Sequence, residues 1–110
     1  MADTHPLSWA QLPWLGFDTE TTGVNPHRDR LVSAALVLRS KGASGSPDSD
    51  IITTWLADPG VDIPDTAAQI HGITTQHARS HGRPIEDVLN EVASALAAHM
   101  VQGYPVVAFN

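Results

Sequence analysis

The 110-residue sequence predicts an α/β protein with a mixed β-sheet, and two observations carry this prediction. Three apolar, strand-like segments stand close together in the first half, and one long amphipathic helix precedes a last apolar strand in the second half. Short connections between the early strands favour antiparallel hairpins, whereas a helix between two strands favours a crossover into a parallel strand. The length allows one domain and excludes two.

Composition narrows the classes of protein that fit. Hydrophobic residues make up 42% of the chain, which is enough for a core, and no apolar run is long enough to span a membrane. The first residues lack the features of a secretion signal and there is no cysteine, so we expect a cytoplasmic protein without disulfides or thiolate metal sites. The net charge of −6 argues against binding of nucleic acid through an extended basic surface, although bound metal ions bring local positive charge to a phosphate.

Three strands are predicted in the first half of the chain. After a lead-in at residues 1–13 that is open to disorder, Trp14–Phe17 is a short apolar segment typical of a buried strand. Leu31–Arg39 is apolar and β-branched and predicts a strand buried on both faces. Glycine, serine, proline and aspartate crowd residues 41–50, so we expect a loop there and an antiparallel third strand at Ile51–Ala57.

Two short helices are predicted next. The first covers Thr66–Ile70, with Asp65 as its N-cap and Gly72 as a left-handed stop. A threonine, Thr74 or Thr75, is placed to cap a second short helical turn.

The long helix and the last strand complete the predicted elements. A linker at residues 79–83 leads into Pro84–Met100, and proline suits the first helical position. Apolar residues recur in this helix at spacings of three and four and predict one buried face: Ile85, Val88, Leu89, Val92, Leu96 and Met100. Val106–Phe109 is the last predicted strand.

Two carboxylates stand one residue apart where the first strand ends. Because side chains alternate along a strand, Asp18 and Glu20 point to the same face, about 7 Å apart. Two such charges repel by about 2–3 kcal/mol at an effective dielectric of about 20, and proximity to an apolar strand adds a desolvation cost. The nearest basic residues, Arg28 and Arg30, lie beyond the following turn. A bound Mg²⁺ or Mn²⁺ ion would relieve both costs, whereas simple solvation or turn capping is the alternative.

Three stretches of the sequence resemble one family. The string Phe17–Gly23 (FDTETTG) resembles the first exonuclease motif of the DEDD superfamily, the DnaQ-like 3′–5′ exonucleases that include the epsilon-type proofreading subunits of polymerases. The segment Pro64–Thr74, ending in His-Gly-Ile-Thr, resembles the family segment that lines the nucleotide pocket. Val106–Asn110 resembles the start of the second motif. The resemblance implies a ribonuclease H-like mixed sheet with flanking helices, in which the last strand lies beside a central first strand.

The resemblance also implies a set of site residues. Asp18 and Glu20 would hold two Mg²⁺ or Mn²⁺ ions and act in catalysis. Contacts with the 3′-terminal nucleotide would come from six further residues: Thr19, Thr21, Thr22, Thr66, His71 and Asn110. For Thr21, Thr22 and His71, plain turn or helix-end hydrogen bonding is the alternative.

The family's remaining acids and its general-base histidine would follow Asn110. We therefore interpret residues 1–110 as a single incomplete, C-terminally truncated exonuclease domain that is inactive alone.

The expected activity is hydrolysis of single-stranded DNA from a free 3′ end by two-metal-ion catalysis, with a DNA polymerase subunit as a candidate partner. An exoribonuclease of the same superfamily is one alternative. The other is a non-catalytic fragment or binding module that keeps half of the metal site.

Overall fold

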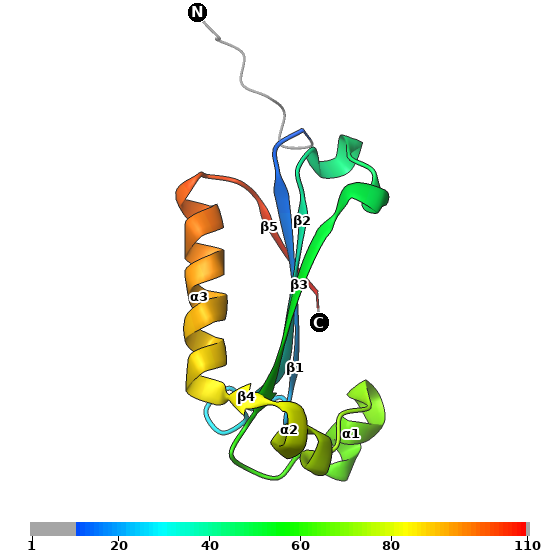
Figure 1. Ribbon diagram of the computed structural model, residues 1–110, viewed down its shortest axis with the longest axis vertical. Coiled ribbons are helices and arrows are strands. Elements are labelled where there is room, and N and C mark those ends of the chain that lie inside the picture. The colour runs from blue at the N-terminus through cyan, green and yellow to red at the C-terminus, as the bar shows by residue number, and fades with distance from the viewer. Residues whose placement is uncertain (1–10, 110) are drawn as a thin grey trace, which may run out of the picture.

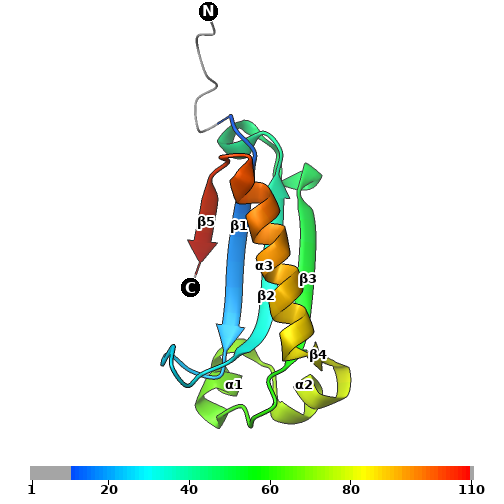
Figure 2. The same ribbon diagram turned by 90° about the vertical axis from the view of Figure 1, so that its left-hand side faces the viewer.

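Five strands form one mixed sheet in the order β4-β3-β2-β1-β5, and this arrangement confirms the predicted fold class. In the computed structural model, which describes residues 11–109, β1 (Trp14–Thr21), β2 (Leu31–Arg39) and β3 (Ile51–Asp58) form consecutive antiparallel pairs. The parallel strand β5 (Val106–Phe109) pairs with the other edge of β1, so β1 has a neighbour on both sides (Figures 1 and 2). Most of the predicted lead-in lies outside the described residues.

The central strand β2 shows which face of the sheet is covered. Its alternate residues Val32, Ala34 and Leu36 are buried, whereas the residues between them are half-buried. The prediction that this strand is buried on both faces is therefore wrong for one face. The reason is that α3 covers one face of the sheet, and the opposite face carries no helix along most of its length (Figure 1).

Helix α3 (Ile85–Val101) matches the predicted long helix to within one residue at each end. Val88 and Val92 are buried against β2 and β3. Leu89 and Met100, both placed on the buried face by the sequence pattern, are 47% and 60% exposed, because the helix meets the sheet along a narrower stripe. None of the described helices is long and apolar enough to cross a membrane.

Helix α1 (Asp65–His71) lies at one end of the sheet (Figure 1). Its N-cap is Pro64, so the prediction of Asp65 as N-cap is wrong by one residue: Asp65 is already helical and its side chain makes no cap bond. Acidic charge in a first helical turn is nevertheless favourable to the helix dipole. The predicted stop at Gly72 is confirmed by its left-handed φ of 76°.

Helix α2 (Thr75–His81) is capped by Thr74, whose side chain accepts a hydrogen bond from the His77 N–H at 3.2 Å. The expectation of a linker at residues 79–83 is wrong, because α2 continues to its end at His81. The two-residue strand β4 (Arg83–Pro84) follows and pairs in parallel with β3. A strand this short has no periodicity that a sequence pattern could show.

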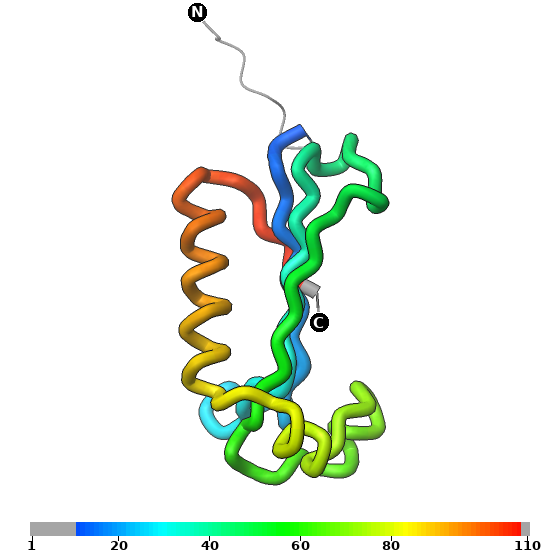
Figure 3. The backbone as a smooth tube through the Cα atoms, viewed as in Figure 1, coloured from blue at the N-terminus to red at the C-terminus, as the bar shows by residue number. Residues whose placement is uncertain are grey.

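The loop predicted at residues 41–50 closes the hairpin at the end of the sheet far from α1 (Figure 3). It contains two short 3₁₀ turns, η1 (Gly42–Ser44) and η2 (Pro47–Ser49). A bidentate pair between Arg39 and Asp50, at 2.9 and 2.8 Å, ties its two ends together.

Candidate nucleotide-binding site and metal ligands

Both acids of the first motif lie on the face of the sheet that α3 leaves open. Phe17 packs into the cluster beneath α3, so the alternating positions of Asp18 and Glu20 point to the opposite face. Asp18 is exposed and Glu20 is half-buried, so the desolvation cost expected from the sequence does not arise for Asp18. Neither carboxylate makes a hydrogen bond or ion pair within residues 11–109.

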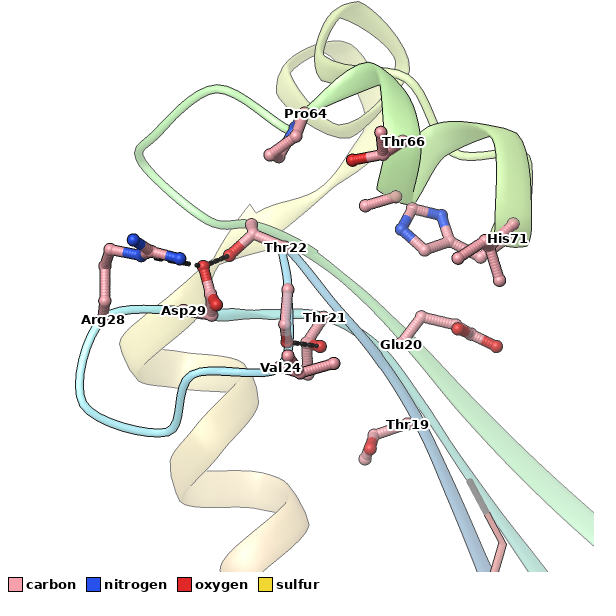
Figure 4. A pocket seen from close by; sticks show the side chains of 13 residues that line it. Thr19, Glu20, Thr21, Thr22, Val24, Arg28, Asp29, Pro64, Thr66 and His71 are labelled. Carbon is pink, nitrogen blue, oxygen red and sulfur yellow. Dashed lines mark hydrogen bonds and ion pairs between the residues drawn. The ribbon is translucent and has the colours of Figure 1, made fainter.

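A pocket of about 790 Å³ opens between the end of β1, the loop at residues 22–30 and α1 (Figure 4). We call it the β1–α1 pocket. Six of the eight site residues expected from the sequence line it: Thr19, Glu20, Thr21, Thr22, Thr66 and His71. Asp18 lies two residues before Glu20 on the same strand face and does not line the pocket. Asn110, the eighth, lies outside the described residues.

His71 closes α1 and presents a polar atom that has no partner. Its Nδ1 accepts a hydrogen bond from the N–H of Ile73 at 3.2 Å, which puts the proton of a neutral ring on Nε2. That Nε2 is buried and unpaired. The alternative role considered for this histidine, satisfying a carbonyl at the helix end, is not what the ring does here. A buried donor without a partner is costly, and such atoms often mark a place where a ligand binds.

The two threonines that follow Glu20 have different local roles. The hydroxyl of Thr21 donates to the carbonyl of Gly23 at 2.5 Å and keeps a lone pair free. The buried hydroxyl of Thr22 donates to Asp29 at 3.1 Å and accepts from the Arg30 N–H at 2.9 Å. The hydroxyl of Thr22 therefore has no proton left to donate to a ligand.

Seven of the lining residues were not among the site residues expected from the sequence, and four of them have side chains suited to contact a ligand or to shape the wall: Val24, Arg28, Asp29 and Ile70. Val24 is fully exposed and Ile70 is 84% exposed, so neither apolar side chain is used in the core. Their neighbours were the available signals, because Val24 directly follows the first motif and Ile70 directly precedes His71. Large exposed apolar groups that line a pocket are suited to contact a flat, apolar surface such as a base.

Asp29 is an anion held within the pocket wall. The N–H of Asn25 donates to its carboxylate at 2.8 Å and is the main cause of a lowered pKa. The hydroxyl of Thr22 and the charge of Arg28, 3.6 Å away, lower the pKa further, and burial opposes them. The carboxylate is therefore ionised at neutral pH and serves as an acceptor only.

Asp18 and Glu20 are chemically suited to bind a hard divalent ion, because their carboxylates offer oxygen ligands that have no other partner among residues 11–109. They supply only two protein ligands for such an ion. No group of three or more His, Cys, Asp or Glu side chains among residues 11–109 is arranged to hold a metal ion.

Comparison with known proteins decides the family. The family model described as Exonuclease (RNase T) matches residues 15–110, which is most of the chain. The chain belongs to this exonuclease family. Membership confirms the resemblance seen in the first motif at the level of the exonuclease family, and the epsilon-subunit type stays a prediction. A search of curated proteins found no match.

Solved structures of Exonuclease I share the fold of this RNase T family chain. One, of E. coli Exonuclease I with a 5cy-dT13 oligonucleotide, is 26% identical with a TM-score of 0.62 over 77% of this chain. A second E. coli structure, with a dT13 oligonucleotide, is 25% identical with a TM-score of 0.61 over 91%. A moderately thermophilic Exonuclease I from Methylocaldum szegediense has a TM-score of 0.63 at 24% identity over 90%. The fold is thus the expected ribonuclease H-like one.

These neighbours are much longer than the chain described here. The matched region spans 18% and 21% of the two E. coli chains and 20% of the Methylocaldum chain. The sequence therefore covers about a fifth of the length of each.

Proposed function

We propose that this chain is the nucleotide-binding and first metal-ligand portion of a 3′–5′ exonuclease acting on single-stranded DNA. One observation carries the proposal: the β1–α1 pocket joins the end of the acid-bearing strand, at Glu20, to the buried and unpaired Nε2 donor of His71. The family membership supports the same reading. The 3′-terminal nucleotide would occupy this pocket.

The pocket residues divide the work of binding according to their chemistry. The Nε2–H of His71 would donate to an acceptor on the nucleotide, which removes the cost of a buried unpaired donor. Val24 and Ile70 would contact the faces of the base, and the exposed hydroxyl of Thr66 would contact the sugar. Thr19 and Thr21 flank Glu20 on β1 and also line the pocket, and they would position the 3′ end.

Asp18 and Glu20 would hold Mg²⁺ or Mn²⁺ as hard oxygen ligands. Divalent ions bound at such a site supply a water of lowered pKa and charge stabilisation for the leaving oxygen. The two carboxylates lie on one face of β1, and neither forms a hydrogen bond or ion pair with another of the described residues. In this role Glu20, which lines the pocket, would lie nearer the scissile phosphate than Asp18.

Single-stranded DNA is favoured over RNA by one finding. Two of the E. coli Exonuclease I structures that resemble this chain are complexes with deoxythymidine oligonucleotides. An exoribonuclease is the alternative within the family, since a sugar contact such as that of Thr66 could also read a 2′-hydroxyl. A polymerase subunit as partner remains an expectation from the resemblance.

The test uses protein expressed from the longest reading frame that contains these residues. We expect stepwise release of mononucleotides from a single strand labelled at its 5′ end, dependent on Mg²⁺ or Mn²⁺ and lost in Glu20→Ala. The matched control is Asp48→Ala, which removes an exposed carboxylate in the far hairpin. An unchanged ladder in Glu20→Ala, or a protein that binds the strand and never shortens it, would favour the binding-module alternative.

A further inference from the structure

The loop at residues 22–30 forms one wall of the β1–α1 pocket and is organised around a single carboxylate. One oxygen of Asp29 accepts from the hydroxyl of Thr22 at 3.1 Å, and the other accepts from the N–H of Asn25 at 2.8 Å. The N–H of Asp29 in turn donates to the carbonyl of Asn25 at 2.7 Å. The side chain is only 11% exposed, so these bonds are poorly replaced by water.

Thr22 connects this carboxylate to the strands. Its hydroxyl donates to Asp29 and at the same time accepts from the N–H of Arg30. The backbone of Thr22 also donates to the carbonyl of Arg30 at 2.9 Å, just beyond the last pairing of β1 with β2. The two ends of the loop are therefore joined directly by the hydrogen bonds between Thr22 and Arg30, and the hydroxyl of Thr22 connects this closure to Asp29.

Gly23 gives a second, independent view of the same contact. A Cβ atom at Gly23 would lie 2.5 Å from a carboxylate oxygen of Asp29 and 2.8 Å from its Cγ. The φ of Gly23 is not positive, so backbone strain does not require glycine there. The glycine of the first motif is needed because the Asp29 carboxylate lies directly against it.

We propose that Asp29 is a positioning residue that holds the loop in the shape placing Val24 and Arg28 along the wall of the nucleotide pocket. Arg28 is suited to contact a bound ligand, because its side chain lines the pocket, is 77% exposed and pairs with the Asp29 carboxylate at 3.6 Å. The effect of Asp29 on nucleotide binding rests on the proposed function, whereas its effect on the shape of the loop rests on the hydrogen bonds alone. Asp29 acts through its neighbours and is not placed on the reacting atoms.

The first experiment measures the loop without any nucleotide. Asp29→Asn keeps the shape of the side chain and replaces one acceptor oxygen with a donor, so amide hydrogen exchange at Asn25 and Arg30 should become about tenfold faster. Amides in the middle of β2 should exchange as in the wild type. The control Asp48→Asn removes an exposed carboxylate that makes no hydrogen bond or ion pair with any of residues 11–109, and it should change neither set. Unchanged loop exchange, or an equal rise in β2, overturns the proposal.

A double-mutant cycle tests the contact with Gly23. Gly23→Ala alone should loosen the same amides, because its Cβ displaces the carboxylate of Asp29. Asp29→Ala removes the three atoms nearest to the added methyl, so in that background Gly23→Ala should have almost no further effect. Fully additive effects of the two substitutions would mean that the contact does not organise the loop.

The second experiment adds 5′-dTMP as a probe of the pocket and follows binding by NMR titration. Asp29→Asn should raise the Kd about tenfold, and Asp48→Asn should leave it unchanged. If the loop loosens and the Kd stays at the wild-type value, the positioning role is overturned. If the wild-type chain shows no binding of 5′-dTMP while loop exchange responds as expected, the proposed function fails and the assignment of Asp29 as the organiser of the pocket wall stands.

Discussion

The backbone N–H of Ile73 donates to Nδ1 of His71 at 3.2 Å, and this one bond directs the other ring nitrogen into a buried position without a partner. The bond fixes the ring and its tautomer together. His71 is therefore oriented before any ligand arrives, which lowers the entropic cost of binding.

Replacing His71 by phenylalanine should weaken nucleotide binding. His71→Phe keeps a ring of similar size and removes the Nε2 donor, so we expect the Kd for 5′-dTMP to rise about tenfold. The unpaired Ile73 N–H should also lower the free energy of unfolding by about 1 kcal/mol. Titration followed by NMR and denaturation with urea measure the two effects. His77→Phe, on the exposed side of α2, is the control, and equal losses in both variants would refute the assignment.

The two apolar side chains at the pocket should matter for binding and not for stability. Val24 and Ile70 are 101% and 84% exposed, so Val24→Ser and Ile70→Ser should change the free energy of unfolding by less than about 0.5 kcal/mol. Each should nevertheless raise the Kd for 5′-dTMP several-fold, because contact area with the base is lost. Val101→Ser, at 82% exposure on α3, is the matched control. Wild-type affinity in both pocket variants would place the base elsewhere.

The two acids should bind a divalent ion together, although weakly. In a Mn²⁺ titration of residues 1–110, paramagnetic broadening should centre on the amides of Phe17–Thr21 and disappear in Asp18→Ala and in Glu20→Ala. The affinity should be low because no third acidic or histidine ligand is available among the described residues. Neither substitution should unfold the chain, since neither carboxylate has a hydrogen-bond or ion-pair partner in the described part of the chain. Broadening centred on the far hairpin, at Asp48 and Asp50, would argue against the site.

Residues 1–110 on their own should release no mononucleotides from a 3′-labelled single strand in Mn²⁺. The reason is the ligand set: within residues 11–109, Asp18 and Glu20 have no further acid or histidine arranged with them. Two carboxylates leave most of a two-metal site unbuilt. A denaturing gel checks this, and metal-dependent release that is lost in Glu20→Ala would show that another side chain completes the site.

Stability at acid pH should depend on Glu91, which links three elements. Arg83 on β4 and Trp55 on β3 both donate to its carboxylate, and the bond from Arg83 is the main reason that its pKa is lowered to about 2. A lowered pKa in the folded state adds stability above the usual value of 4.5, and this gain is lost as the pH falls toward 2. Denaturation of wild type and Glu91→Gln should therefore differ near neutral pH and converge near pH 2. A difference between the two proteins that is the same at pH 2 as at neutral pH would contradict this role of Glu91.

The main elements of the fold were predictable because their signals are local. β2 is an apolar, β-branched run, α3 has a clear period of three and four, and Gly72 stops α1 where its φ becomes positive. The exposed positions of Leu89 and Met100 were not predictable, because the width of the stripe that α3 buries is set by the sheet beneath it. The strand β4 was not predicted, because two residues are too few to show a periodic pattern.

The candidate site also contains residues that were predictable from the sequence and residues that were not. Glu20 and His71 belong to recognisable motifs, and the structure brings both to one pocket from segments about fifty residues apart. Asp29 was not predictable, because its carboxylate accepts from the hydroxyl of Thr22 and the backbone N–H of Asn25, whose positions follow only from the folded loop. An aspartate next to a turn is common in proteins and is usually solvated, so its presence there carried no signal of this role.

The pairing of β1 with β5 also bears on how the chain folds. β5 joins β1 through pairs such as Leu15 with Val106, which come from opposite ends of the described chain. Contacts of such long sequence separation carry a large loop-closure entropy and slow the folding of a domain. During synthesis β1 can pair with β2 early, but its second edge stays open until β5 leaves the ribosome. The strand that bears the acids is therefore completed among the last parts of the sheet, and until then its free edge is the part of the nascent chain most open to pairing with another molecule.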